Sequence, residues 1–97
     1  MPRSPMADQY APLGDYLTRQ AAAGLRQVVL PFAQLEVAIL GHPLPPSARR
    51  SRHWWRNNGA QSHAWHGWLR AGWFVGAVSL ATETVTFTRR DEAEGDR

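Results

Sequence analysis

The sequence predicts a small α+β domain whose elements follow the order helix, strand, helix, irregular segment, helix and β-hairpin. Three observations predict this class: apolar residues recur at helical spacing in three stretches, apolar and polar residues alternate over 84–89, and a proline-rich run at 42–47 separates the second and third helical stretches. This is the order of a winged helix-turn-helix domain. However, about 19 residues link the second and third helices, where a helix-turn-helix uses three or four. We therefore expect a winged-helix-like domain with a long basic insertion before the third helix.

The first helix is expected over residues 12–24. Pro12 suits its first position and Gly24 suits its exit. Residues 26–31 then read as a short strand that ends at Pro31. In a winged-helix arrangement this strand pairs with the hairpin.

The second helix is expected over residues 32–41, where apolar residues recur three and four apart and Gly41 provides a stop. The prolines of residues 42–47 exclude regular structure there. Ser47 is then placed to cap a short helical turn over 48–55.

The third helix is expected over residues 60–72. At 100° per residue, one face gathers Trp65, Trp68, Leu69 and Gly72, which we expect to face the core. The opposite face gathers His63, His66 and Arg70, with Gly67 between them. Because this second face has no acidic residue and Gly67 allows close approach, it suits a groove lined by phosphates. The alternative is an ordinary solvated face.

The hairpin is expected to consist of strands at 73–79 and 84–89 around a turn at 80–83. In the second strand Val85 and Phe87 alternate with threonines, so one side is expected to be buried and the other in contact with water.

The chain ends read as disordered tails, residues 1–9 and 90–97, around a single domain over 10–89. The longest apolar run, residues 73–81, is far shorter than the roughly 20 residues of a membrane-spanning helix. The N-terminus does not resemble a signal peptide, and the chain has no cysteine. We therefore expect a cytoplasmic, soluble protein without a membrane partner.

The positive charge is concentrated in the middle of the chain. The formal net charge is +3, and no Asp or Glu occurs between Val37 and Thr82. The same stretch contains five arginines: Arg49, Arg50, Arg52, Arg56 and Arg70. This distribution favours an anionic partner.

Residues 47–58 place four of these arginines and His53 around two adjacent tryptophans. Mixed basic and aromatic residues are typical of nucleic-acid surfaces. No carboxylate is near in sequence, so we expect most of the arginines to face water or an anion. One of Trp54 and Trp55 is expected to anchor the segment in the core, and the other to be exposed for stacking on a base. The alternative is that both rings are core and the arginines stack on them.

The sequence argues against a metal site, a cofactor and an enzyme. The histidines at 42, 53, 63 and 66 have no cysteine or carboxylate nearby to complete a zinc set, and their spacing fits no standard site. General acid–base catalysis draws on a carboxylate near a histidine, and the central region has none.

Several motifs resemble a family of small bacterial domains of unknown function: "YAPLGDYL", "LPPSAR" with "WWRN", and "WLRAGWFVGAVSLATETVTFTR". The resemblance covers residues 10–89 and implies one intact domain, without an assigned reaction. In the family a Ser or Thr usually precedes the phenylalanine that opens the second helix; here it is Pro31, so that helix lacks its usual cap. The positions that match the central and C-terminal motifs are Leu44, Pro45, Ser47, Ala48, Arg49, Trp54, Trp55, Asn57, Trp68, Leu69, Gly72 and Trp73.

We expect a non-enzymatic protein that binds nucleic acid, with duplex DNA as the first expectation. Its contact residues are expected to be Arg49, Arg50, Arg52, His53, Trp54, Arg56, Asn57, His63, His66 and Arg70. Two alternatives stay open. One is a protein-interaction module, or a homodimer, that uses an exposed aromatic and basic surface; the other is a small nuclease.

Overall fold

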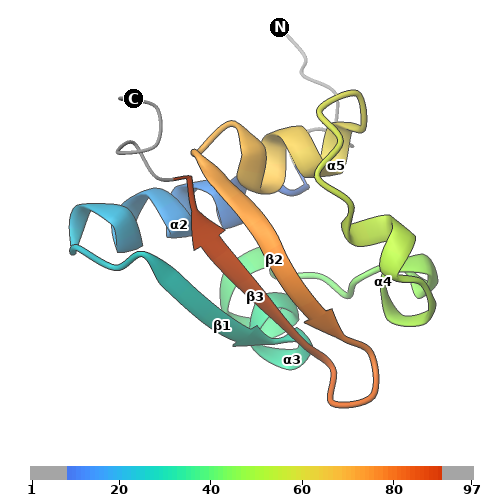
Figure 1. The fold of residues 1–97 in the computed structure, drawn as a ribbon. Coiled ribbons are helices and arrows are strands. Elements are labelled where there is room, and N and C mark those ends of the chain that lie inside the picture. The colour runs from blue at the N-terminus through green and yellow to red at the C-terminus, as the bar shows by residue number, and fades with distance from the viewer. Residues whose placement is uncertain (1–8, 91–97) are drawn as a thin grey trace, which may run out of the picture.

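The computed structural model describes residues 9–90 and confirms the predicted α+β class (Figure 1). The two predicted tails, apart from Gln9 and Arg90, lie outside the described residues. Two of the helices begin as α-helix and continue as π-helix. In chain order the elements are α2 (Ala11–Ala22), β1 (Gln27–Pro31), α3 (Phe32–Gln34), the π-helix η1 (Leu35–Leu40), α4 (Pro46–Arg50), the 3₁₀ turn η2 (Arg52–Trp55), α5 (Ser62–Ala64), the π-helix η3 (Trp65–Leu69), β2 (Trp73–Ser79) and β3 (Thr84–Arg89). No helix among the described residues is long and apolar enough to cross a membrane.

The three strands form one antiparallel sheet in the order β1-β3-β2. The predicted pairing of the first strand with the hairpin is therefore confirmed, with Val29 opposite Thr86. The predicted alternation in β3 is also confirmed, because Val85 and Phe87 are fully buried while Thr84, Thr86 and Thr88 are partly exposed.

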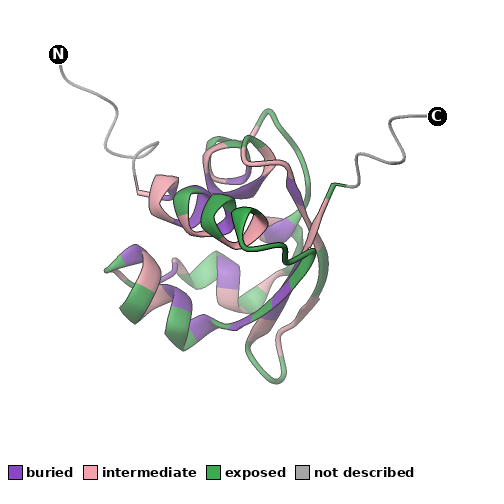
Figure 2. Cartoon of the chain, turned by 90° about the vertical axis from the view of Figure 1, so that its left-hand side faces the viewer, coloured by how far each residue is buried: buried purple, intermediate pink, exposed green. Residues whose placement is uncertain are grey.

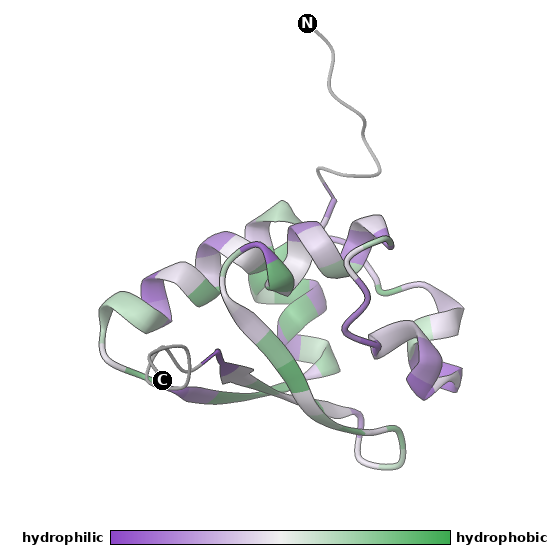
Figure 3. Cartoon of the chain, turned by 45° about the horizontal axis from the view of Figure 1, so that its top comes forward, coloured by the Kyte–Doolittle hydropathy of each residue, from purple (hydrophilic) through white to green (hydrophobic). Residues whose placement is uncertain are grey.

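The helices lie against one face of the sheet, and the core fills the space between them. Figure 2 shows buried residues on the sides of the helices and strands that face one another. The largest fully buried side chains include Trp68, Trp73, Phe32 and Phe87. By contrast, hydrophilic residues gather on α4 and η2 at one end of the domain (Figure 3).

The predicted orientation of the third helix is wrong in two places. Trp65, expected in the core, is 44% exposed, and Gly67, expected on the outer face, is buried against Tyr10 and Leu13. The buried positions are Ala64, Gly67 and Trp68, which are three and four residues apart, so the apolar stripe runs through two small residues and not through Trp65. The turn that follows is π-helical, because Arg70 N donates to Trp65 O at 2.9 Å across five residues instead of four.

Glycines allow α2 and η3 to pack at close range. A Cβ atom on Gly14 would lie 2.8 Å from the backbone oxygen of His66. A Cβ atom on Gly67 would make only ordinary van der Waals contacts, at 3.6 Å from Leu13 and Tyr10. Gly67 is therefore enclosed by the N-terminal part of the chain and is not open to the approach of a ligand.

Gly14→Ala is expected to destabilise the protein, although the same change in an ordinary helix interior stabilises by roughly 0.5–1 kcal/mol. The added methyl meets backbone, which must move, and we expect a loss of about 1–3 kcal/mol in the free energy of unfolding. Gly59→Ala is the matched control, since its Cβ would meet nothing closer than 3.9 Å. Thermal or urea melts of both variants test this, and a Gly14→Ala variant as stable as the parent would show that the helices are not in close contact.

Candidate functional site

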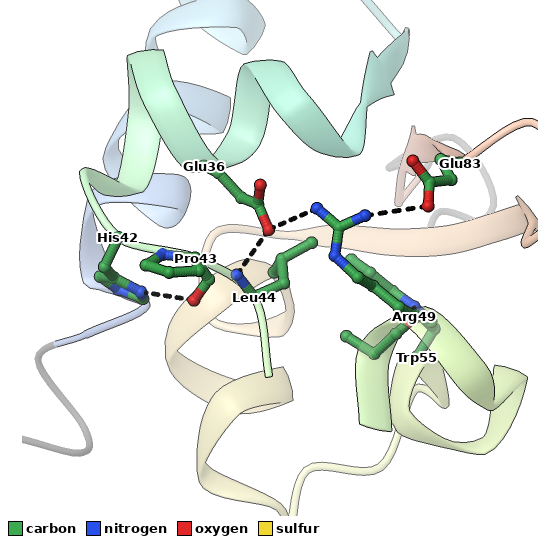
Figure 4. Close-up of polar contacts among 8 residues, drawn as sticks. Glu36, His42, Pro43, Leu44, Arg49, Trp55 and Glu83 are labelled. Carbon is green, nitrogen blue, oxygen red and sulfur yellow. Dashed lines mark hydrogen bonds and ion pairs between the residues drawn. The ribbon is translucent and has the colours of Figure 1, made fainter. Parts of the chain in front are cut away.

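Arg49 is held by two carboxylates that are distant in sequence (Figure 4). Its guanidinium lies 2.6 Å from Glu36 Oε2 and 2.9 Å from Glu83 Oε2. These two residues are the ones that bound the acid-free stretch of the sequence. Arg49 is therefore an exception to the expectation that most of the arginines face water or an anion, and it joins α4 to the second helix and to the hairpin turn.

The hairpin turn also provides a hydrogen-bond partner at the start of the second helix. As expected from Pro31, no side chain among the described residues caps α3. The Phe32 N–H donates instead to the backbone oxygen of Glu83 at 2.8 Å. Glu83 reaches this position with φ of 56°, in the left-handed region that non-glycine residues rarely adopt. The hairpin turn therefore docks through both the backbone and the side chain of Glu83.

Glu36 should make the stability of the protein depend on pH in the acid range. The Leu44 N–H bond, at 2.8 Å, and then the Arg49 guanidinium hold the pKa of the Glu36 carboxyl below its ordinary value. A lowered folded-state pKa gives stability that is present above the unfolded pKa of about 4.3 and is lost as the pH falls through the folded pKa. We expect Glu36→Gln to flatten the stability curve below about pH 4.3 relative to the parent. Urea unfolding as a function of pH measures this, and curves of equal slope would contradict it.

Trp55 is the tryptophan that anchors the basic segment, residues 47–58, in the core. It is 2% exposed, its indole N–H donates to Ala48 O at 2.8 Å, and its ring stacks on Phe32. Trp54 is only partly buried. The expectation that one ring of the pair is core is confirmed for Trp55, whereas Trp54, expected to be exposed, packs against the core and stacks on His63.

His63 belongs to this aromatic cluster and not to an outer binding face. Its ring stacks on Trp54 with centroids 4.0 Å apart and planes at 8°. Its Nε2 lies 2.7 Å from Trp54 O, so Nε2 carries the proton and Nδ1 is left as an acceptor in the neutral ring. Burial lowers the pKa of His63. The predicted outer face of His63, His66 and Arg70 therefore does not form.

Asn57, expected to contact nucleic acid, uses both polar atoms of its side chain in hydrogen bonds within the domain. Oδ1 accepts from the Trp68 indole at 2.9 Å and from Val75 N at 2.8 Å, and Nδ2 donates to Val75 O at 3.1 Å. Val75 lies in β2, an edge strand of the sheet. The carboxamide thus occupies backbone groups that a further strand would otherwise pair with.

Arg70 and His66 lie away from the basic segment. Arg70 shares a shallow pocket with Gly14, Asp15, Thr18 and Ala71. The backbone of His66 is packed on α2 at Gly14. These two residues therefore do not join the arginines of α4 and η2 in one surface.

Four of the predicted contact residues are exposed at this end of the domain. Arg50 ends α4, Arg52 and His53 lie in η2, and Arg56 directly follows η2. Arg56 Nη1 lies 3.3 Å from Nε2 and 3.5 Å from Nδ1 of His53, so the guanidinium lies against the imidazole ring. None of the described carboxylates lies within ion-pair distance of Arg50, Arg52 or Arg56. We call this group the basic surface.

A pocket of about 310 Å³ opens beside the basic surface. Three of its lining residues, Ser47, Ser51 and Gln61, were not expected as site residues, since serine and glutamine side chains are common at surface positions and carry no binding signal in one sequence. Within residues 9–90 no three His, Cys, Asp or Glu side chains come together as a metal site would require. The pocket is lined by Ser47, Ser51, His53, Trp54, Gln61 and His63.

Comparison with known proteins agrees with the resemblance in the sequence. Searches of curated proteins and of solved structures found no match. The family model described as Domain of unknown function (DUF7662) matches residues 10–91, which is nearly all of the chain that the structure describes. The chain therefore belongs to the DUF7662 family.

Proposed function

We propose that this protein binds nucleic acid through the basic surface of Arg50, Arg52, His53 and Arg56, as a binding protein and not as an enzyme. The observation that carries the proposal is the division of charge around α4. Glu36 and Glu83 both engage Arg49, whereas the three remaining guanidinium groups are exposed and have no carboxylate partner among the described residues. Exposed arginines in this state are suited to bidentate contact with phosphate.

The arrangement of elements gives further support. Helix, strand, helix, helix and hairpin in this order, with a β1-β3-β2 sheet, are compatible with a winged-helix-like domain. In such a domain the hairpin is the wing and the third helix enters the groove. Here the third helix exposes Trp65, while the arginines lie on the insertion, so we assign the contact to the insertion.

A protein partner is the second candidate, and the exposed Trp65 favours it. Tryptophan is enriched at the centre of protein interfaces. The other exposed large apolar residues lie on separate elements: Leu25 ahead of β1, Val29 in β1 and Val37 in η1. Because they are dispersed, they do not outweigh the clustered arginines.

Salt dependence separates the two functions. We expect fluorescence anisotropy to detect binding to labelled duplex or single-stranded DNA at about 50 mM salt and a steep loss at about 200 mM, because bound phosphates release counterions. An aromatic protein interface does not share this dependence. Absence of binding to either form of DNA at the lower salt would contradict the proposal and favour a protein partner.

A further inference from the structure

The pocket beside the basic surface has the chemistry of a site for a neutral heterocycle. Its volume of about 310 Å³ lies at the small end of the range for small-molecule sites. Serine hydroxyls, imidazoles, an amide and an indole line it, and no carboxylate of residues 9–90 does. These groups can both donate and accept hydrogen bonds.

Two residues at the α5 end of the pocket have acceptor capacity that the fold leaves unused. Gln61 Oε1 is buried and has no hydrogen-bond partner among the described residues. A buried polar atom in this state is costly and calls for an explanation. His63 uses Nε2 for Trp54 O, which leaves Nδ1 as an acceptor. Both residues line the pocket, so a ligand with N–H groups can supply the missing donors once the Gln61 amide turns toward it.

Part of the pocket lining adjoins the basic surface. Ser51 joins Arg50, the last residue of α4, to Arg52, the first residue of η2. Its hydroxyl oxygen accepts the His53 N–H at 3.1 Å, so Ser51 also fixes the start of η2. His53 itself lines the pocket and carries the Arg56 guanidinium. Positive charge therefore borders a neutral, hydrogen-bonding pocket.

We infer that this pocket receives one unstacked base of a single-stranded nucleic acid whose phosphates lie on the basic surface. The inference rests on the proposed function and adds that the bound nucleic acid is single-stranded. A base in a duplex is stacked and paired, and it reaches a pocket only after it is extruded at an energetic cost. Single strands present their bases freely, so they are the preferred form.

The test compares strands that carry the same charge but differ in their bases. We expect a single-stranded oligothymidine of about ten nucleotides to bind roughly tenfold more tightly than a strand of the same length made of abasic units. An oligouridine of equal length shows whether the sugar matters, and a matched duplex is expected to bind more weakly than the oligothymidine. All measurements are made by anisotropy at one low salt concentration.

A variant tests whether the pocket causes the difference in affinity between the base-containing and abasic strands. Gln61→Leu keeps the volume of the side chain and removes a carbonyl that has no partner, so we expect the fold to remain stable. It should lower the preference for the base-containing strand to roughly twofold or less while affinity for the abasic strand is unchanged. Gln34→Leu makes the same change at an exposed position of α3 and should retain the preference.

The outcomes separate this inference from the function on which it rests. Equal binding of base-containing and abasic strands by the parent protein would overturn the pocket and leave phosphate binding standing. A base preference that survives in Gln61→Leu would also overturn it. Absence of binding to every strand would overturn both proposals.

Discussion

Trp68→Ala is expected to lower the free energy of unfolding by about 3–5 kcal/mol, which is most of the stability of a domain of this size. Trp68 is fully buried, stacks on Trp55 and contacts Phe87. Its indole N–H is also one of the two donors to Asn57 Oδ1. The truncation therefore leaves a cavity in the core and loosens the residue that covers the edge of β2.

Trp65→Ala removes the same side chain from the same helix and is the matched control. Because Trp65 is 44% exposed, we expect a loss of only about 1 kcal/mol or less. Urea unfolding of both variants, followed by far-UV circular dichroism, measures the difference. Losses of similar size would mean that Trp65 is packed in the core as Trp68 is, which is the orientation of the third helix expected from the sequence.

Arg49→Glu is expected to lower the free energy of unfolding by about 2 kcal/mol. The change removes the charged hydrogen bonds to Glu36 and Glu83 and places a third carboxylate between them. Most of the loss should come from Glu36, whose side chain is 17% exposed, because the 54% exposed Glu83 is screened by water.

Arg50→Glu is the control for this reversal of charge. Arg50 is the next residue in α4, is exposed, and has no carboxylate partner among the described residues, so a change within about 0.5 kcal/mol is expected. Thermal melts at low salt compare the two variants. An Arg49→Glu variant that melts with the parent would mean that the Glu36–Arg49–Glu83 contact does not hold the hairpin, and it would return Arg49 to the candidate binding residues.

The sequence predicts the elements well where short-range rules decide them. Gly41 ends the second helix in the left-handed conformation, with φ of 78°, as glycine after the last apolar residue predicts. Val85 and Phe87 are buried as their alternation with threonine predicts. The orientation of the third helix is not predictable in this way, because the small residues Ala64 and Gly67 form an apolar stripe with Trp68 at the same spacing as the stripe centred on the tryptophans.

In the candidate site, too, some features follow from short-range sequence patterns and others depend on contacts between residues distant in the chain. The acid-free stretch and its arginines indicate a basic surface, and three of the four arginines of residues 47–58 remain exposed. That Arg49 differs from its neighbours depends on Glu36 and Glu83, which are 13 and 34 residues away along the chain. The roles of Asn57 and His63 depend likewise on Val75 and on the carbonyl of Trp54, contacts that only the folded chain brings together.

The most direct test of the proposed function is the affinity of two triple variants of equal net charge for single-stranded and duplex DNA at low salt. One carries Arg50→Glu, Arg52→Glu and Arg56→Glu on the basic surface. The other carries Arg19→Glu, Arg70→Glu and Arg90→Glu, at exposed positions elsewhere in the domain. We predict that the first loses affinity by roughly a hundredfold or more, because each reversal replaces a phosphate contact with repulsion, and that the second loses far less. Equal losses in the two variants, or binding by the first that matches the parent, would contradict the assignment of nucleic-acid binding to this surface.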